Sequence, residues 1–514
     1  MKNFNFLMLY FALSFAIAGC EKSIEDPTTE APVDNRETFE DDPFKNLVKD
    51  SILYYTKVFS LWESSMPPED LNDILIQDTL RGYTKYYETG QDVLSWLMSL
   101  TPIDPTTGNP IDRFSFLDRQ GAVSSEIQEA VATSYGMYLI YLQTNPAVNN
   151  AELYVRMVDA GSPADGVGIQ RGSRIISING NSEIDYVTQE ASDFEFLNNA
   201  LSASSMNIVF LDENNQEVTA SIRSSIYTYD PILAVEVFDL GTKKAGYLAF
   251  SSFVSITNTN GSYTQMYRDF EDIFSTFASS GISDLIIDLR YNGGGLVETA
   301  EYLADEICPS SANGQLMFTY DINDLLESEG FLTDPEYFGP VSFRKSGSLN
   351  LSQVYFLVTN ETASASELLI NVLEPYMDVL LVGAYGSNSA KENTYGKPIG
   401  FFAIPIVSDD IELYPTSFQM FNSEGYGDYF GGLVPDIHTY EDFLKDFGDP
   451  EEGLIAEALY HIQNNKFYNA ATAKSAIASI DKLNAAKVVA VKSIGKNQGA
   501  KGMFKFNKDQ IKLK

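Results

Sequence analysis

Histidine and cysteine are scarce in this chain of 514 residues, which contains only two of each. Neither an H-E-x-x-H motif nor a cysteine cluster is present, so a metal mechanism has little support, and we expect no metal and no other cofactor. With Cys20 and Cys308 alone, a disulfide framework is excluded as well. Stability must therefore come from apolar cores.

Basic residues are also in short supply: 34 Lys and Arg face 71 Asp and Glu, for a net charge of −37. Nucleic acid would be repelled by such a chain and is not expected as a partner. The shortage is uneven, because residues 466–514 hold eleven lysines against Asp481 and Asp509. We interpret this segment as a basic C-terminal tail, solvated and frayed; contact with an anionic surface is the alternative.

Long apolar runs are absent, with one short exception at the N-terminus. Lys2 precedes the run FLMLYFALSFAIAG, which is too short to anchor a helix across a bilayer but is typical of a signal peptide. Residues 16–20 (AIAGC) resemble the lipobox of bacterial lipoproteins. By that resemblance residues 1–19 are removed and Cys20 is lipidated; an ordinary secretory signal is the alternative. The acidic, Thr- and Pro-rich residues 20–42 predict a flexible tether.

The rest of the chain changes its apolar pattern twice, which predicts a multidomain α+β protein. Apolar residues recur at helical spacing over 43–118, and this predicts a helical N-terminal domain. Short strands and turns follow over 120–225, including ELYVRMV and IISI before Asn179-Gly180. Over 226–465 buried strands alternate with amphipathic helices, as in an α/β core with a largely parallel sheet.

Two serines stand in the sequence ETASASELL, where the apolar strand QVYFLV meets an apolar helix. Ser364 and Ser366 therefore lie near a helix N-terminus, whose N–H groups favour a developing negative charge. The same position suits serines that only cap a helix. Either of them could be a nucleophile, or the stretch could be only a tightly packed turn.

A second motif, DLRYNGGG, ends another buried strand in three consecutive glycines, Gly293 to Gly295. Glycines free backbone N–H groups to face a ligand. The Lys-Ser/Thr of a phosphate loop is missing, so an oxyanion hole for acyl transfer fits better.

A serine nucleophile needs a base, and the sequence offers no G-x-S-x-G elbow. Lysine can take this role when its surroundings lower its pKa. Lys397, in NTYGKPIG, is the candidate, although a lone lysine in a loop is usually a solvated charge. Lys391 is a rival.

AGYLAFSSF, DLRYNGGGL and TASASELL…TYGKPIG together resemble the C-terminal-processing (tail-specific) serine peptidases, relatives of the tricorn protease core. The resemblance implies a crotonase- or tricorn-like ββα core. It makes Ser364 the nucleophile and Lys397 the base, with oxyanion donors at Ala365 and Gly294, and it leaves Ser366 a supporting role. Residues around 385–392 form an insertion that contains Lys391. Where some members carry a glutamine four residues after the lysine, this chain has Phe401, so no third catalytic residue is assigned.

Residues 120–225 resemble the PDZ domain that these peptidases carry, through AGSPADGVGIQRGSRIISING. The resemblance makes Ser134, Tyr135, Gly136 and Met137 the carboxylate-binding loop. It implies a protease that selects polypeptides by exposed C-termini, in the form found in envelope lipoproteins of Bacteroidetes-type bacteria, facing the periplasm or the cell surface. An inactive peptide- or ligand-binding lipoprotein on the same fold, and a surface scaffold, are the alternatives. The oligomeric state is not predicted.

Overall fold

The computed structural model describes residues 39, 42–105, 107–145, 147–334, 337–351, 353–408, 411–468, 489–494 and 502–504. Cys20 and the predicted signal peptide lie outside these ranges, as do nearly all of the predicted tether and most of the predicted tail. None of the helices within the described ranges is both long and apolar enough to cross a membrane.

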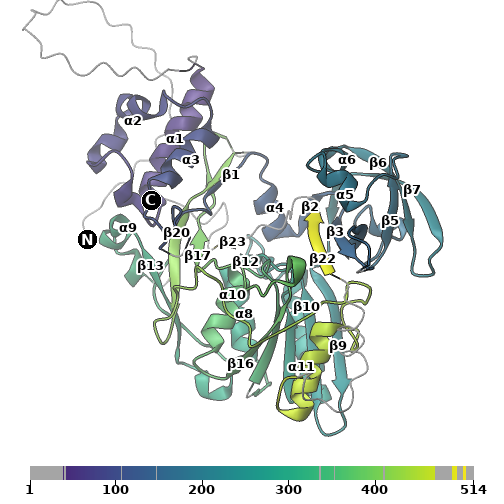
Figure 1. Cartoon of the computed structure of the whole chain (residues 1–514). Helices are drawn as coiled ribbons and strands as arrows, with labels where there is room; N and C mark the ends of the chain where they lie inside the picture. Colours follow the sequence, from purple (N-terminus) through teal and green to yellow (C-terminus); the bar gives the residue numbers. More distant parts are fainter. Residues whose placement is uncertain are drawn as a thin grey trace, which may run out of the picture.

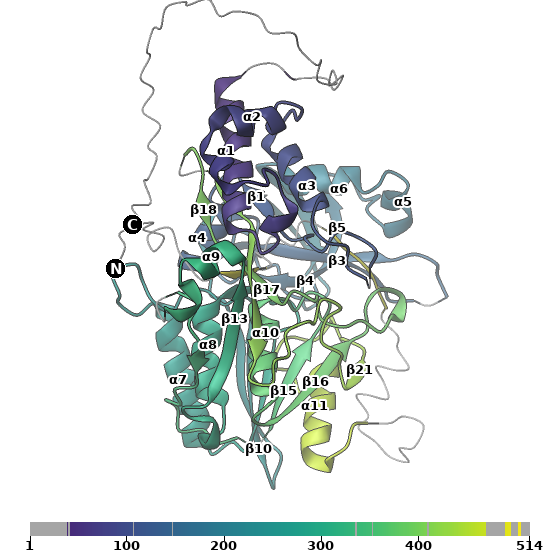
Figure 2. The ribbon, with the colours of Figure 1, turned by 90° about the vertical axis from the view of Figure 1, so that its left-hand side faces the viewer.

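The N-terminal part is a small helical unit, as its apolar spacing predicted. Asp42 caps the first helix by accepting hydrogen bonds from two backbone N–H groups, and Thr89 and Asp92 cap the third reciprocally. The unit sits at the end of the core opposite the last helix, α11 (Gly453–Asn464) (Figure 2). Its helices are α1 (Pro43–Phe59), η1 (Glu63–Ser65), η2 (Leu71–Leu75), α2 (Gln77–Thr84) and α3 (Gly90–Ser99).

A second unit, residues 122–228, is built on an antiparallel sheet with short helices. The predicted strands ELYVRMV and IISI are confirmed as β4 and β5, and β6 pairs antiparallel with β7. The elements are α4 (Ala122–Glu129), β2 (Val131–Ser134), β3 (Met137–Gln143), β4 (Glu152–Val158), η3 (Asp165–Val167), β5 (Arg174–Ile178), α5 (Tyr186–Glu190), α6 (Glu195–Ser202), β6 (Ser205–Leu211), β7 (Glu217–Arg223) and β8 (Ser225–Thr228). Figure 1 shows this unit beside the core.

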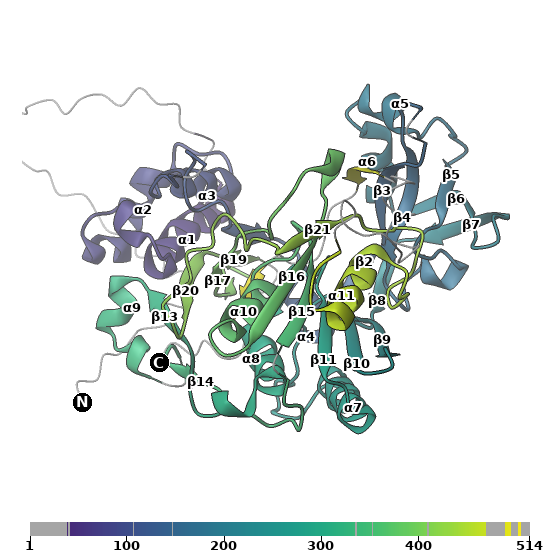
Figure 3. The ribbon, with the colours of Figure 1, turned by 60° about the horizontal axis from the view of Figure 1, so that its bottom comes forward.

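The core is centred on a six-stranded sheet of order β21-β16-β15-β11-β10-β9, parallel except at β9. Alternate residues face opposite layers: Leu285 and Ile287 pack among α7, α8 and α10, whereas Ile286 packs toward α11 (Figure 3). The elements are β9 (Ile232–Asp239), β10 (Lys244–Phe250), α7 (Gln265–Ser280), β11 (Asp284–Asp288), α8 (Val297–Ile307), β15 (Gln353–Val358), α10 (Ala365–Leu373), β16 (Asp378–Ala384) and β21 (Ile437–Thr439).

A second core sheet has the order β12-β23-β17-β20-β13-β14, and a three-stranded sheet joins β1 to β19 and β18. The strands are β1 (Phe116–Asp118), β12 (Gly294–Leu296), β13 (Leu316–Ile322), β14 (Val341–Ser342), β17 (Ile399–Phe401), β18 (Ile404–Pro405), β19 (Glu412–Tyr414), β20 (Thr416–Asn422) and β23 (Gly502–Phe504). Short helical turns complete the core: η4 (Ser310–Ala312), α9 (Asp324–Ser328), η5 (Phe331–Thr333) and η6 (Ser387–Ser389).

Two segments of the predicted tail are strands, so the prediction of a solvated end is wrong for them. Besides β23 in the core, β22 (Val489–Ile494) pairs antiparallel with β3 at the edge of the second unit (Figure 1). The physical reason is apolar content that the lysine count hid: Ile494, Met503 and Phe504 are buried in three different hydrophobic clusters.

Candidate active site

Ser364 occupies the sharp turn between β15 and α10. Its backbone has φ +65° and ψ −109°, a left-handed conformation that non-glycine residues rarely adopt. Its side-chain oxygen is buried and makes no hydrogen bond within the part of the chain that the structure describes. Capping of α10 by this hydroxyl therefore does not account for the residue. A strained turn that holds a buried serine hydroxyl is the arrangement of a nucleophile.

The glycine motif packs directly against the serine turn. The backbone carbonyl of Asn292 accepts hydrogen bonds from the N–H of Ala363 (3.1 Å) and the hydroxyl of Ser366 (3.0 Å), so Ser366 joins the serine turn to the glycine motif. A Cβ added at Gly294, whose φ is +111°, would lie 3.1 Å from the backbone nitrogen of Ala365. The two predicted oxyanion donors are thus neighbours, and only glycine fits at position 294.

The two donors differ in how they are used. Ala365 is the first residue of α10, where a backbone N–H has no acceptor inside the helix. The Gly294 N–H, by contrast, donates to Asn292 Oδ1 at 2.9 Å. An oxyanion would share this N–H with the asparagine or displace it.

The loop that carries Lys397 packs against the serine turn. The N–H of Tyr395 donates to the carbonyl of Thr362 at 2.9 Å, which fastens the lysine loop to the serine turn. Lys397 is only 2% exposed, and its Nζ lies 3.6 Å from the centre of the Phe401 ring. The predicted rival, Lys391, is exposed and lies in the inserted loop, where it bridges to Tyr385. Burial favours Lys397.

Glu367 is a site residue that the sequence left without a role. Its Oε2 accepts hydrogen bonds from the backbone N–H groups of Ser364 (2.8 Å) and Lys397 (2.9 Å). Its Oε1 accepts from the N–H of Gly396 (2.7 Å) and from the Thr394 hydroxyl. One fully buried carboxylate thus joins the serine turn to the lysine loop. Burial raises the pKa of Glu367, and these four donors oppose that rise.

The change Glu367→Gln is expected to slow catalysis about 10–100-fold and to lower the free energy of unfolding by about 1–3 kcal/mol. The reason is that all four partners of this carboxylate donate, so a Gln amide group would face donors with a donor. Steady-state kinetics and urea unfolding measure the two effects. Glu374→Gln, at the exposed end of the same helix, is the matched control. Equal rates in both variants would contradict the positioning role.

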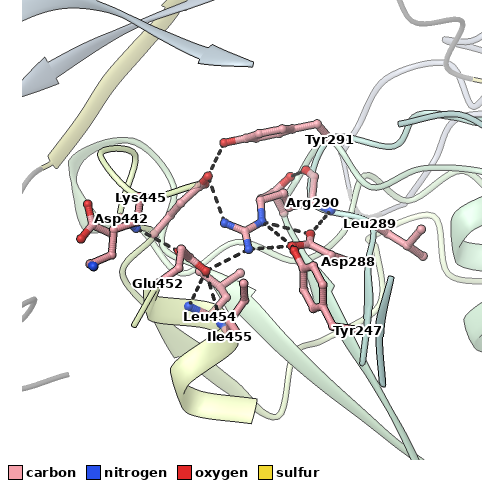
Figure 4. A network of polar contacts seen from close by, with 12 residues as sticks. Tyr247, Asp288, Leu289, Arg290, Tyr291, Asp442, Lys445, Glu452, Leu454 and Ile455 are labelled. Atoms are coloured by element: carbon pink, nitrogen blue, oxygen red, sulfur yellow. Dashed lines mark hydrogen bonds and ion pairs between the residues drawn. The ribbon is translucent and has the colours of Figure 1, made fainter. Parts of the chain in front are cut away.

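A buried charge network surrounds Arg290, at the start of the glycine motif. The guanidinium of Arg290 bonds Asp288 (2.7 Å), Glu452 (2.9 Å) and Glu441 (3.2 Å), and Tyr247 donates to Asp288 at 2.7 Å (Figure 4). Burial lowers the pKa of Arg290, but the three carboxylates outweigh that effect and raise it well above its ordinary value. The network fixes the point where β11 leaves the sheet and the glycine motif begins.

The second unit is tied to both catalytic motifs. Arg156 of β4 forms a two-pronged ion pair with Glu361, just before the serine turn (2.6 and 2.9 Å), and its guanidinium stacks on the Tyr291 ring. Arg171 pairs with Glu441 at 2.7 Å. A cavity of about 450 Å³ opens beside these contacts, lined by Glu361, Thr394 and Tyr395 and by β22. Residues of the second unit and residues next to the candidate site therefore line the same cavity.

The predicted carboxylate loop lies between β2 and β3. Gly136 takes φ +73°, and its N–H donates to the Ser134 hydroxyl at 2.9 Å. The Tyr135 hydroxyl donates to the Ala203 carbonyl, and Met137 begins β3. The loop thus stands at the head of the edge strand that β22 joins. Among the described residues no group of three or more His, Cys, Asp or Glu could hold a metal ion.

Comparison with known proteins gives one family for the core: the model of peptidase family S41 matches residues 244–439. The chloroplastic carboxyl-terminal-processing peptidase 1 of Arabidopsis thaliana is 26% identical over 257 residues, 48% of this chain and 44% of that protein. A carboxyl-terminal-processing protease of Synechocystis is 24% identical over 261 residues, 50% of this chain and 52% of that one. The chain thus spans about half the length of these curated relatives.

Among solved structures, a protein described as an S41 protease from Bacteroides fragilis superposes with a TM-score of 0.59. The match covers 84% of this chain and 99% of that one at 22% identity, which establishes a shared fold. The resemblance to C-terminal-processing peptidases inferred from the three motifs is confirmed.

Proposed function

We propose that the chain is a serine peptidase that cuts polypeptides with a Ser364–Lys397 dyad, on the basis of the match between residues 244–439 and the model of peptidase family S41. The assignment depends on one observation: Glu367 Oε2 accepts hydrogen bonds from the backbone N–H groups of both Ser364 and Lys397. Ser364, with a buried hydroxyl on a strained turn, is held as a nucleophile would be.

In this mechanism the Ser364 oxygen attacks the scissile carbonyl carbon, and the Lys397 amine takes the hydroxyl proton. The carbonyl oxygen becomes an oxyanion, and the N–H of Ala365, aided by that of Gly294, stabilises it. The protonated lysine then gives its proton to the leaving amine, and water releases the acyl group. No step requires histidine or a metal.

The second unit supplies selection in this proposal. The loop from Ser134 to Met137 would bind a substrate carboxylate, and β3 would add an extended peptide as an extra strand. The ion pair between Arg156 and Glu361 would couple peptide binding in the second unit to the position of the serine turn. Lipidation of Cys20 would hold the enzyme at the bacterial envelope.

The test is cleavage of unstructured polypeptides that carry either a free or an amidated C-terminus, compared with the Ser364→Ala protein. We expect cleavage that falls at least about 10³-fold in that variant, and faster cutting of the free-ended substrates. Circular dichroism checks that both proteins are folded. A folded parent that binds these polypeptides without cutting them would instead indicate a binding protein on the same fold.

A further inference from the structure

A short strand of the chain itself lies between the two halves of the candidate site. β12 begins within the glycine motif, at Gly294, and β17 follows Lys397; the two strands do not pair with each other. β23 runs between them, parallel to both, with Gly502 opposite Gly294 and Phe504 opposite Phe401. Without β23 this gap would be an open slot with a strand edge on each side.

The gap lies at the reacting groups. The N–H of Gly502 donates to the Gly293 carbonyl at 3.1 Å. The point where a Gly294 Cβ would lie is 2.5 Å from the Gly502 carbonyl oxygen and 3.1 Å from the Ala365 nitrogen. The occupying segment thus brings a peptide carbonyl next to the predicted oxyanion donors.

The same part of the chain also occupies the edge of the second unit. β22 adds antiparallel to β3, directly after the loop from Ser134 to Met137, and Ile494 lies opposite Leu139. Ile494 is buried, and Lys492 Nζ lies 4.0 Å from the centre of the Phe194 ring, next to the start of α6. PDZ domains, which the second unit resembles in sequence, bind peptides by strand addition at such an edge.

We propose that β22 and β23 are two parts of an internal pseudosubstrate, in which β22 occupies the peptide groove of the second unit and β23 occupies the peptidase groove. This inference rests on the proposed function for the meaning of the second groove. Ile494, at the end of β22, and Gly502, at the start of β23, are eight residues apart, so at most about 28 Å of extended chain joins them. One polypeptide could therefore bind in both grooves. The cavity of about 450 Å³ borders β22 on one side and Thr394 and Tyr395, just before Lys397, on the other.

The occupant also indicates the substrate class. A Cβ added at Gly502 would lie 2.5 Å from the Phe504 ring of the same strand and 3.1 Å from the Phe401 ring of the groove, so glycine suits this position when Phe follows two residues later. Met503 is fully buried, and the Phe504 ring packs on Phe401 and Tyr414. We therefore expect the site to take extended polypeptides with two large apolar residues at the positions of Met503 and Phe504.

The test measures binding in proteins that cannot cut. A fluorescent peptide of sequence VAVKSIGKNQGAKGMF, residues 489–504, is titrated into the Ser364→Ala chain with and without Met503→Asp and Phe504→Asp. The two aspartates should expel β23 from its apolar slot, so the peptide should bind at least about ten-fold more tightly to the opened protein. A peptide carrying the same two aspartates should not show this gain. Gln463→Asp with Lys466→Asp, both on exposed positions, is the matched control.

A second arm leaves both grooves unchanged and serves if the opened variant does not fold. A recognition site for a specific protease is placed within residues 469–488 of the Ser364→Ala chain, and the cut protein is diluted. The released segment should stay bound, and excess peptide of the sequence above should displace it. Immediate loss of the segment on dilution, or equal peptide affinity in the closed and opened proteins, would overturn the proposal.

Hydrolysis measured in parallel separates this inference from the proposed function. With Ser364 intact, the opened protein should cut a Gly-Met-Phe-containing polypeptide faster than the parent. Improved binding without any cutting would uphold the pseudosubstrate and refute the peptidase. If the opened protein and the parent cut at the same rate, and the opened protein does not bind the peptide more tightly, the peptidase is upheld and the pseudosubstrate is refuted.

Discussion

Methionine in place of Lys397 is expected to reduce peptide hydrolysis about 10³–10⁴-fold, to the level of the Ser364→Ala protein. Methionine keeps the length and the apolar stem of lysine, so the contacts with Phe401 and Phe114 can persist while the amine is lost. The backbone N–H of residue 397 still donates to Glu367, so the turn is retained. The loss therefore reports the proton transfer and not the shape of the loop.

Lys391→Met is the matched control for this change. It removes the same charge six residues earlier, from an exposed position in the inserted loop, and should leave kcat and KM unchanged. The double variant Ser364→Ala with Lys397→Met should be no slower than either single variant, because two members of one catalytic unit are not additive. If Lys391→Met were the inactive variant and Lys397→Met the active one, the assignment of the base would be reversed.

Arg290→Met is expected to lower the free energy of unfolding by about 3–5 kcal/mol. Asp288, Glu441 and Glu452 would remain buried around a side chain that cannot pair with them. The control is Arg174→Met, which breaks an ion pair with Glu152 whose side chains are 36% and 45% exposed; a loss below about 1 kcal/mol is expected there. Urea unfolding of both variants measures the difference.

The pH dependence of the Arg290→Met effect gives a further check on its cause. Burial raises the pKa of Glu441, but Arg171 and Arg290 outweigh this and lower it, so its contribution to stability is present above the unfolded pKa and is lost as the pH falls through the folded one. Removing Arg290 takes away one of the two arginines that lower the pKa of Glu441, so acid then neutralises this carboxyl more easily. The deficit of the variant should shrink from pH 8 to pH 5. A deficit independent of pH would indicate lost packing alone.

The sequence predicted most of the core because its local patterns agree with its tertiary contacts. β10, β11, β15 and β16 are continuous apolar runs, and both of their faces are buried. Ser364, Lys397, Gly294 and Ala365 were predicted as a group, and the structure places their backbones around one turn, while their roles stay a prediction. Motif order carried this information, since the residues themselves are far apart along the chain.

Other features were missed for identifiable physical reasons. Glu367 was visible only as an acid after the serines, and its role depends on Lys397 N–H and Gly396 N–H, which come from another loop. The strand β23 has three residues, too few for any periodicity. The run VAV in β22 was a usable strand signal, but eleven lysines in the same region outweighed it. Its partner strand, β3, lies more than three hundred residues earlier in the chain.

The place of β23 in the chain order has a consequence for biosynthesis. Its neighbours β12 and β17 are translated long before residues 502–504 leave the ribosome, and domains fold as units while synthesis proceeds. The site around Ser364 is therefore assembled with its groove open and is filled only when the last described strand arrives. A nascent or prematurely terminated chain would carry a complete and uncovered site.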